Sequence, residues 1–241
     1  MNGNKILITG FLHSGTTILR AKFSDCENVY FQIRETQLPE QSEYEKYLES
    51  GKEFFLWKDP VIRKAIYNSE FPDRNVFLKD THLIFLVRNP FFVFSSLQRR
   101  DVNIVTHWNH TFEDWERSAY FFLKMREEKH EGTYTIKYEE FFDENYQNLK
   151  NIMSSIGLKY DDNIFLERKK EYYHDKERSV PLEQPTKYSW NSPYRVWQIN
   201  QDFQNFNLRD EVKLTPDLYE KICNSPVLKL LGYEIIENNP I

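Results

Sequence analysis

Residues 10–17 read Gly-Phe-Leu-His-Ser-Gly-Thr-Thr and have the Gly-x4-Gly-x-Thr spacing of a phosphate-binding loop. The apolar run 5–9 before them predicts a buried strand, and residues 16–23 predict the start of a helix. Backbone N–H groups at a helix start, aided by the helix dipole, bind anions. Thr16, however, stands where ATPases and GTPases carry the lysine that holds the β- and γ-phosphates. The stretch therefore predicts a site for a phosphate-like group other than the γ-phosphate of ATP.

A second anion-binding group is predicted where Arg88 follows the apolar run 83–87. Ligands of open α/β sheets bind at the carboxyl ends of the strands. On a helix that begins at Pro90, Ser96 and Arg100 are four residues apart and share a face, which Arg88 can join. One hydroxyl and two guanidinium groups suit a phosphate, because arginine binds phosphate oxygens in pairs. The alternative is a solvated basic helix end whose arginines complement the helix dipole.

The elements that must position these groups alternate between strand and helix along the chain. Strands are expected at residues 6–9, 29–33, 54–57, 82–87 and 134–137. Helices are expected to begin at residue 16 and to span residues 42–50, 61–69, 91–99, 113–128, 145–156 and 216–222. Such alternation predicts an α/β fold of the P-loop type, a three-layer arrangement with a mostly parallel central sheet between helices.

The length of 241 residues suits one domain spanning residues 1–241. The stretch at about 169–197 has no clear periodicity, and we interpret it as an irregular lid or substrate loop because long structureless loops are mostly functional. The net charge of −5 argues against a nucleic-acid or anionic membrane partner. Cys26 and Cys223 are interpreted as reduced thiols. No signal peptide is recognised, and the apolar runs are too short to span a bilayer. We therefore expect a cytoplasmic protein.

Together the two anchors resemble the family of PAPS-dependent sulfotransferases, where PAPS is 3′-phosphoadenosine 5′-phosphosulfate. In that family a Ser-Gly-Thr-Thr loop holds the 5′-phosphosulfate, and residues 14–17 match it. An Arg-x7-Ser pair holds the 3′-phosphate, and Arg88 and Ser96 match it. By the same resemblance Tyr138, Ser179 and Lys187 are expected to contact the nucleotide. The resemblance implies transfer of a sulfuryl group from PAPS, which leaves 3′,5′-ADP (PAP).

Within the family the sequence is most similar to the tyrosylprotein sulfotransferase branch. Residues 58–60 match its Lys-Asp-Pro, residues 177–179 match its Glu-Arg-Ser, and Arg100 lies twelve residues beyond Arg88, as the second 3′-phosphate arginine of that branch does. Residues 35–37 read Glu-Thr-Gln where the branch has Glu-Thr-Arg, so the arginine that helps to bind an acidic peptide is replaced. The acceptor therefore stays open between a glycan, a small molecule and a peptide tyrosine, and the sequence does not fix the oligomeric state.

The resemblance implies in-line attack of an acceptor hydroxyl on sulfur, a reaction that depends on positioning and electrostatic stabilisation. The loop residues expected to hold the 5′-phosphosulfate are His13, Ser14, Gly15, Thr16 and Thr17. His13, which stands where the family usually has Lys or Arg, is expected to stabilise the leaving phosphate oxygen, and Lys58 the sulfuryl oxygens. A sulfuryl group carries less negative charge than a terminal phosphate, so no metal is expected.

Glu35 is the predicted general base, and Arg34 beside it would keep the carboxylate ionised. The other candidates for the base are Asp59, His82, His107 and His110. Two other functions remain open: a P-loop nucleotide kinase or NTPase, and a non-catalytic relative that binds a nucleotide without turnover. Thr16 in the lysine position opposes the kinase, and His13 in the basic position favours the non-catalytic relative.

Overall fold

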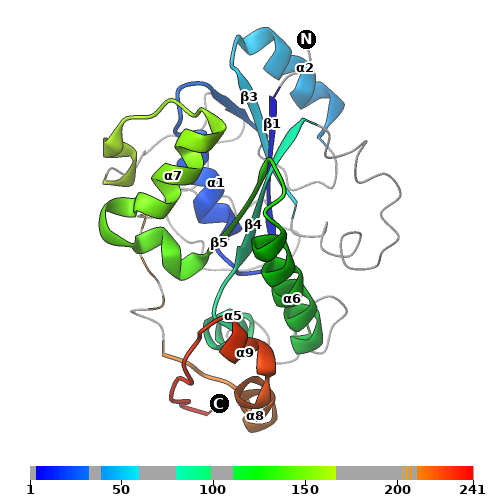
Figure 1. The fold of residues 1–241 in the computed structure, drawn as a ribbon, viewed down its shortest axis with the longest axis vertical. Helices are drawn as coiled ribbons and strands as arrows, with labels where there is room; N and C mark the ends of the chain where they lie inside the picture. Colours follow the sequence, from blue (N-terminus) through cyan, green and yellow to red (C-terminus); the bar gives the residue numbers. More distant parts are fainter. Residues whose placement is uncertain are drawn as a thin grey trace, which may run out of the picture.

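The computed structural model describes residues 4–32, 39–59, 80–98, 111–166, 203, 205, 207 and 211–240. In these residues five parallel strands form one sheet in the order β2-β3-β1-β4-β5. The strands are β1 (Asn4–Gly10), β2 (Val29–Phe31), β3 (Phe54–Lys58), β4 (Thr81–Val87) and β5 (Thr133–Lys137). The predicted α/β fold with a parallel central sheet between helices is confirmed (Figure 1).

Two separate cores lie on the two faces of the sheet, because successive strand residues point to opposite sides. Leu7 and Phe85 face the core that includes α5 (Pro90–Gln98), α6 (Phe112–Glu128), α8 (Pro216–Asn224) and α9 (Pro226–Leu230). The neighbouring residues Ile8 and Ile84 face the other core, with α1 (Thr16–Ser24) and α7 (Gln147–Ile156). Figure 1 shows α1 and α7 on one side of the sheet and α6 on the other.

The long helix α6 shows how local sequence sets an element of this fold. Its capping box is closed by Thr111, whose Oγ1 accepts from the backbone N–H of Asp114 at 3.2 Å, while the Asp114 carboxylate accepts from the backbone N–H of Thr111 at 3.4 Å. Trp115, Ala119 and Phe122 recur at helical spacing and are fully buried against the sheet. The helix predicted at residues 113–128 is therefore confirmed to within one residue.

Most described strands and α-helices lie close to their predicted positions, and among the α-helices α7 and α9 differ for identifiable reasons. Helix α7 begins at Gln147 rather than at residue 145, because Asn145 and Tyr146 have left-handed backbones with φ of 58° and 57°. Helix α9 was not predicted; it has only five residues, too few for a periodic pattern, and begins at Pro226. The helix expected at 61–69 and the loop expected at about 169–197 lie outside the described residues.

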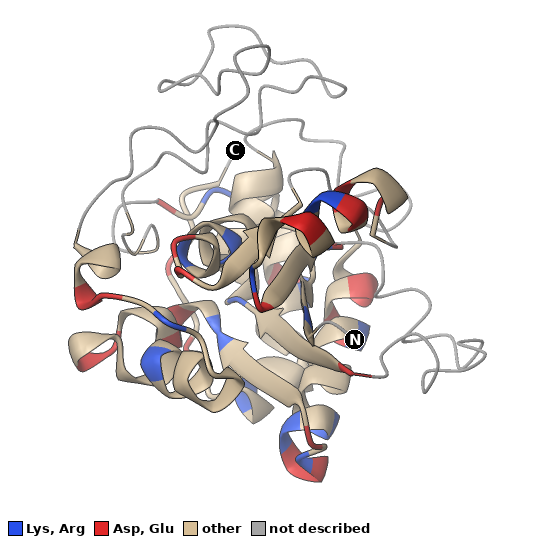
Figure 2. Cartoon of the chain, turned by 90° about the horizontal axis from the view of Figure 1, so that it is seen from above, with Lys and Arg blue, Asp and Glu red and all other residues tan. Residues whose placement is uncertain are grey.

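Helix α2 (Gln41–Ser50) carries charges of both signs, as do α6 and α8, and Figure 2 colours these charged residues on the ribbon. Several of these charges form surface pairs, such as Lys46 with Glu43 at 2.7 Å and Lys124 with Glu128 at 3.7 Å. Exposed pairs of this kind each contribute at most about 1 kcal/mol to stability. In a chain of net charge −5, an anionic ligand must therefore be held by basic groups at the site itself.

Most of the candidate site residues in the described part of the chain lie just beyond the carboxyl ends of the strands. Residues 11–15 follow β1, Asp59 follows β3, Arg88 follows β4 and Tyr138 follows β5. Because all five strands are parallel, these ends meet along one edge, where ligands of open α/β sheets bind. None of the described helices combines the length and the apolar character that a bilayer span requires.

Candidate functional site

The turn between β1 and α1 is packed so closely against neighbouring elements that both of its glycines are required. Gly15 has a φ of +92°, and a Cβ there would lie 2.4 Å from Cδ2 of Tyr138. A Cβ on Gly10 would lie 2.5 Å from the carbonyl oxygen of Leu86 in β4. Helix α1 begins directly after Gly15, and the carbonyl of Gly15 accepts the backbone N–H of Leu19 at 3.0 Å. The turn therefore has the geometry of an anion-binding loop at a helix N-terminus.

Ser14 lies in this turn with its side chain fully buried. Its Oγ has no hydrogen-bond partner among the described residues. A buried hydroxyl left in this state costs about 1–3 kcal/mol, so a ligand oxygen that bonds to it would restore the loss. The hydroxyl of Ser14 thus fits the phosphosulfate that the sequence predicts for this loop.

His13 joins the loop to the second predicted anchor. Its backbone φ is +62°, in the left-handed region. Its carbonyl oxygen accepts a hydrogen bond from Nη1 of Arg88 at 3.2 Å, and its ring Nδ1 lies 2.8 Å from Oγ of Ser96 in α5. The structure therefore brings His13, Arg88 and Ser96 together.

Lys58, the last residue of β3, lies beside the same loop. Its side chain is buried, and Nζ donates to Oγ1 of Thr17 at 2.6 Å. The following residue, Asp59, is also buried, and its carbonyl oxygen accepts from Oγ1 of Thr9 in β1 at 2.7 Å. These contacts hold the end of β3 against β1, with the Lys58 ammonium at the first turn of α1.

The guanidinium of Arg88 is held on several sides. Nε and Nη2 donate to Oδ1 of Asn207 at 2.9 and 2.6 Å, and Cζ lies 4.4 Å from the centre of the Tyr138 ring. The backbone carbonyl of Arg88 accepts from Nε1 of the buried Trp115 at 3.2 Å. The Tyr138 ring is itself buried and thus contacts Arg88 and the Gly15 turn rather than solvent.

Three residues of this site were missed by the sequence analysis: Asn207, Glu139 and Tyr233. Nδ2 of Asn207 donates to Oε1 of Glu139 at 2.8 Å, and the Tyr233 hydroxyl donates to Oε2 of Glu139 at 2.9 Å. Burial, followed by the charge of Glu139, raises the pKa of Tyr233 well above its usual value, so its hydroxyl stays a donor. Glu139 comes two residues after the end of β5, a position that places it near the carboxyl edge of the sheet but gives the residue no role.

Several predicted site residues lie outside the described part of the chain, so their placement stays a prediction. They are Glu35, Arg100, Ser179 and Lys187, together with Arg34, His107 and His110. Among the other candidates for the base, Asp59 lies at the carboxyl edge of the sheet. His82 is the second residue of β4, about 20 Å from Arg88 at the rise of an extended strand.

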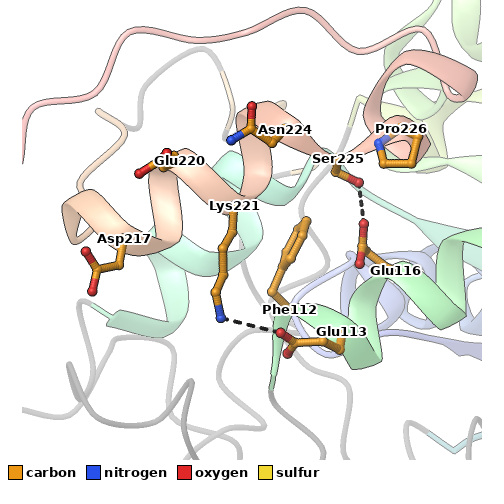
Figure 3. A pocket seen from close by; sticks show the side chains of 9 residues that line it. All are labelled: Phe112, Glu113, Glu116, Asp217, Glu220, Lys221, Asn224, Ser225 and Pro226. Carbon is orange, nitrogen blue, oxygen red and sulfur yellow. Dashed lines mark hydrogen bonds and ion pairs between the residues drawn. The ribbon is translucent and has the colours of Figure 1, made fainter.

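A pocket of about 550 Å³ lies away from the loop, between α6, α8 and α9 (Figure 3). Lys221 in this pocket pairs with Glu113 at 3.4 Å, and Oγ of Ser225 donates to Glu116 at 2.5 Å. Four carboxylates and a single lysine line it, so its charge opposes an anionic nucleotide. Within the described residues, no three His, Cys, Asp or Glu side chains gather in a way that could hold a metal ion.

A parallel sheet with an anion-binding loop after β1 and an arginine after β4 is typical of P-loop-type α/β folds, and comparison with solved structures narrows the fold further. The sulfotransferase domain from the curacin biosynthetic pathway has a TM-score of 0.56 at 12% identity, covering 97% of this chain and 99% of that chain. Mouse sulfotransferase SULT7A1, solved with PAP, has a TM-score of 0.54 at 17% identity, covering 95% and 88%.

A third match is the sulfotransferase domain from the Synechococcus PCC 7002 olefin synthase, with a TM-score of 0.52 at 14% identity over 98% of this chain and 97% of that chain. No protein-family model and no curated protein matches this sequence. The predicted resemblance to sulfotransferases is thus confirmed as a shared fold, and these structures do not single out the tyrosylprotein branch.

Proposed function

We propose that this protein is a sulfotransferase that moves a sulfuryl group from PAPS to an acceptor hydroxyl and releases PAP. The observation that carries the proposal is the pair of contacts made by His13. Through its carbonyl and its ring, His13 touches Arg88 and Ser96, so the 5′-phosphosulfate loop and the 3′-phosphate anchor are adjacent. One adenosine that carries both groups can therefore contact both anchors. The PAP bound to mouse SULT7A1, which has the same fold, supports this donor.

The residues present fit the donor substrate at its 5′ end. The N-terminus of α1 and the glycine turn supply backbone N–H groups, and the buried Oγ of Ser14 supplies a hydroxyl that has no partner among the described residues. The Thr16 and Thr17 side chains stand at the same helix start. With Thr16 in place of lysine, the loop suits a phosphosulfate better than the triphosphate of ATP, which opposes the kinase alternative.

In the proposed reaction, the acceptor oxygen forms a bond to sulfur while the bond from sulfur to the 5′-phosphate oxygen breaks. The acceptor proton passes to Glu35, the predicted base, and the electron pair of the broken bond stays on the phosphate of PAP. Lys58 would stabilise charge on the sulfuryl oxygens, since its ammonium lies at Thr17. His13, whose Nδ1 lies against Ser96, would reach the leaving oxygen through its other ring nitrogen.

Thermal unfolding of the purified protein with each candidate nucleotide tests the donor. We expect PAP to raise the melting temperature and ATP with Mg²⁺ to leave it unchanged, since a ligand stabilises the folded state that binds it. Stabilisation by ATP with Mg²⁺ and none by PAP would instead favour a nucleotide kinase.

Turnover is measured as PAP released from PAPS in the presence of a panel of glycan, small-alcohol and tyrosyl-peptide acceptors. We expect release with at least one class, which would also identify the acceptor. A Glu35→Ala variant should bind PAP but release none, because it lacks the base. Binding of PAP by the wild type without release from any class would indicate the non-catalytic relative.

A further inference from the structure

We propose that Glu139 is a positioning residue that acts through Asn207 to fix the guanidinium of Arg88, and so sets the preference of the site for a nucleotide with a 3′-phosphate. The inference rests on the proposed function, because it assigns a 3′-phosphate to Arg88. Neither Glu139 nor Asn207 touches the reacting atoms in this proposal. Their effect is on the affinity for one phosphate of the donor.

The first step of the argument is the contact between Asn207 and Arg88. One amide oxygen accepts from two nitrogens on the same side of the guanidinium, Nε at 2.9 Å and Nη2 at 2.6 Å. Nη1 donates to the carbonyl of His13 at 3.2 Å, and the flat face lies over the ring of Tyr138. A planar group held at its edges and on its face keeps one orientation, and an arginine oriented in advance loses less freedom when it binds a phosphate.

The second step is the contact between Asn207 and Glu139. Because Nδ2 of Asn207 donates to Oε1 of Glu139 at 2.8 Å, its Oδ1 must be the atom that faces Arg88. The same Oε1 accepts from the backbone N–H of Asn89 at 3.0 Å, and Oε2 accepts from the Tyr233 hydroxyl at 2.9 Å. Both carboxylate oxygens of Glu139 are therefore fixed, and they fix the amide in turn.

The arrangement joins segments that are far apart in the sequence. Arg88 follows β4, Glu139 follows β5 in the 3-10 helix η2 (Tyr138–Phe142), Asn207 comes from a late segment, and Tyr233 follows α9. Asn207, which accepts two of the Arg88 hydrogen bonds, is a neutral amide, and the Glu139 carboxylate stands one residue further along this chain of hydrogen bonds. A carboxylate at position 207 would be 2.6–2.9 Å from the guanidinium, if the geometry is kept, and would compete with an incoming phosphate for its charge.

The test compares the dissociation constants of PAP and of adenosine 5′-monophosphate (AMP), measured by titration calorimetry on the full chain. The two probes differ only in the 3′-phosphate, so the ratio of their dissociation constants reports the contacts to that phosphate, to which Arg88 is assigned. We expect Asn207→Ala and Glu139→Ala to weaken PAP about tenfold, as for a lost hydrogen bond to a charged group, and to leave AMP unchanged. Glu139→Gln should restore most of the PAP affinity, because its amide oxygen still accepts from Asn207 and Asn89.

Asn28→Ala is the matched control. Its side chain also links a glutamate and backbone, with Nδ2 donating to Glu53 at 3.0 Å and to the carbonyl of Gly157 at 3.1 Å, and it precedes β2 at the opposite edge of the sheet. We expect this variant to lower the melting temperature and to keep the wild-type ratio of the two constants. A general loss of structure would weaken both probes, whereas the positioning role weakens PAP alone.

If the ratio of the PAP and AMP dissociation constants is unchanged in Asn207→Ala and Glu139→Ala, the positioning role is wrong. The proposed function would still stand, because the wild type would still prefer PAP. A wild type that does not prefer PAP to AMP would overturn both. If an alanine variant fails to fold, the same two dissociation constants are measured for Asn207→Asp, which keeps the shape of the side chain. We expect it to weaken PAP about tenfold relative to AMP, and an unchanged ratio would overturn the inference.

Discussion

Gly15 is the residue on which the shape of the anion-binding turn depends most directly. Its φ of +92° and its contact with the Tyr138 ring exclude a side chain for two separate reasons, backbone strain and lack of space. Gly51, at the end of α2, shares only the first, because its φ is +70° but a Cβ there would meet no atom within 4 Å. Comparing alanine substitutions at the two glycines therefore separates the cost of backbone strain from the cost of steric crowding.

We expect Gly51→Ala to lower the free energy of unfolding by about 1 kcal/mol through strain. Gly15→Ala should lower it by a further amount of about 1–3 kcal/mol, because Tyr138 must move. Urea unfolding of both variants measures the difference. Equal losses would show that the Tyr138 ring yields to a methyl group and that crowding plays no part.

The residues of the loop could be predicted from the sequence, because their roles follow from glycine spacing and from a helix start next to a strand. Arg88 was predicted for a similar reason, as the residue that ends an apolar strand. Asn207 could not be predicted: it bonds to Arg88 across 119 positions of sequence, and no local pattern marks an asparagine between Phe206 and Leu208 as a ligand of that arginine. Tyr233 was missed likewise, since its partner Glu139 lies 94 positions away.

At the scale of elements, helix caps are the feature most open to measurement. Thr111 caps α6 with a side-chain hydrogen bond, whereas Thr215, at the same position before α8, makes no such bond. We expect Thr111→Ala to lower the free energy of unfolding by about 1 kcal/mol and Thr215→Ala to lower it by clearly less, as urea unfolding would measure. A Thr215→Ala loss equal to that of Thr111→Ala would contradict the importance of the capping box.

The helices and strands were largely predictable, because apolar residues recur in the sequence at the spacing of an amphipathic helix or form the short runs typical of buried strands. Helix α6 was located to within one residue because its buried stripe has a clear helical period. The predicted start of helix α7 was two residues too early, because nothing in the sequence indicates that Asn145 and Tyr146 adopt left-handed backbone conformations. The order of the strands was also beyond sequence reasoning, because alternation predicts a parallel sheet but not which strand lies in the middle.

At the scale of the whole molecule, His82 links stability to pH. It lies in β4 between the rings of Phe54 and Tyr134, each 6.1 Å away, and burial lowers its pKa. Its Nδ1 is buried without a hydrogen-bond partner in the described part of the chain. As pH falls through about 6.5, the unfolded chain takes up this proton before the folded protein does.

The free energy of unfolding should therefore be highest above about pH 6.5 and decline below it, with a slope of at most about 1.4 kcal/mol per pH unit from this group. We expect His82→Phe, which suits the aromatic surroundings, to reduce that decline, as urea unfolding at about pH 8 and about pH 5.5 would measure. Replacement of His130, which is exposed on the surface, serves as the control. An undiminished decline in His82→Phe would assign the effect to other groups.

The position of β1 in the middle of the sheet has a consequence for biosynthesis. The ribosome makes β1 before both of its neighbours, which begin at Phe54 and Thr81. The nascent strand has no partner on either side until residues 54–58 have been made, and its side toward β4 stays unpaired until residues up to Val87 have left the exit tunnel. Only then can Leu86 pack against Gly10, at the start of the turn between β1 and α1. A nascent chain released before that point would expose one side of this apolar strand to chaperones and could not yet bind a nucleotide.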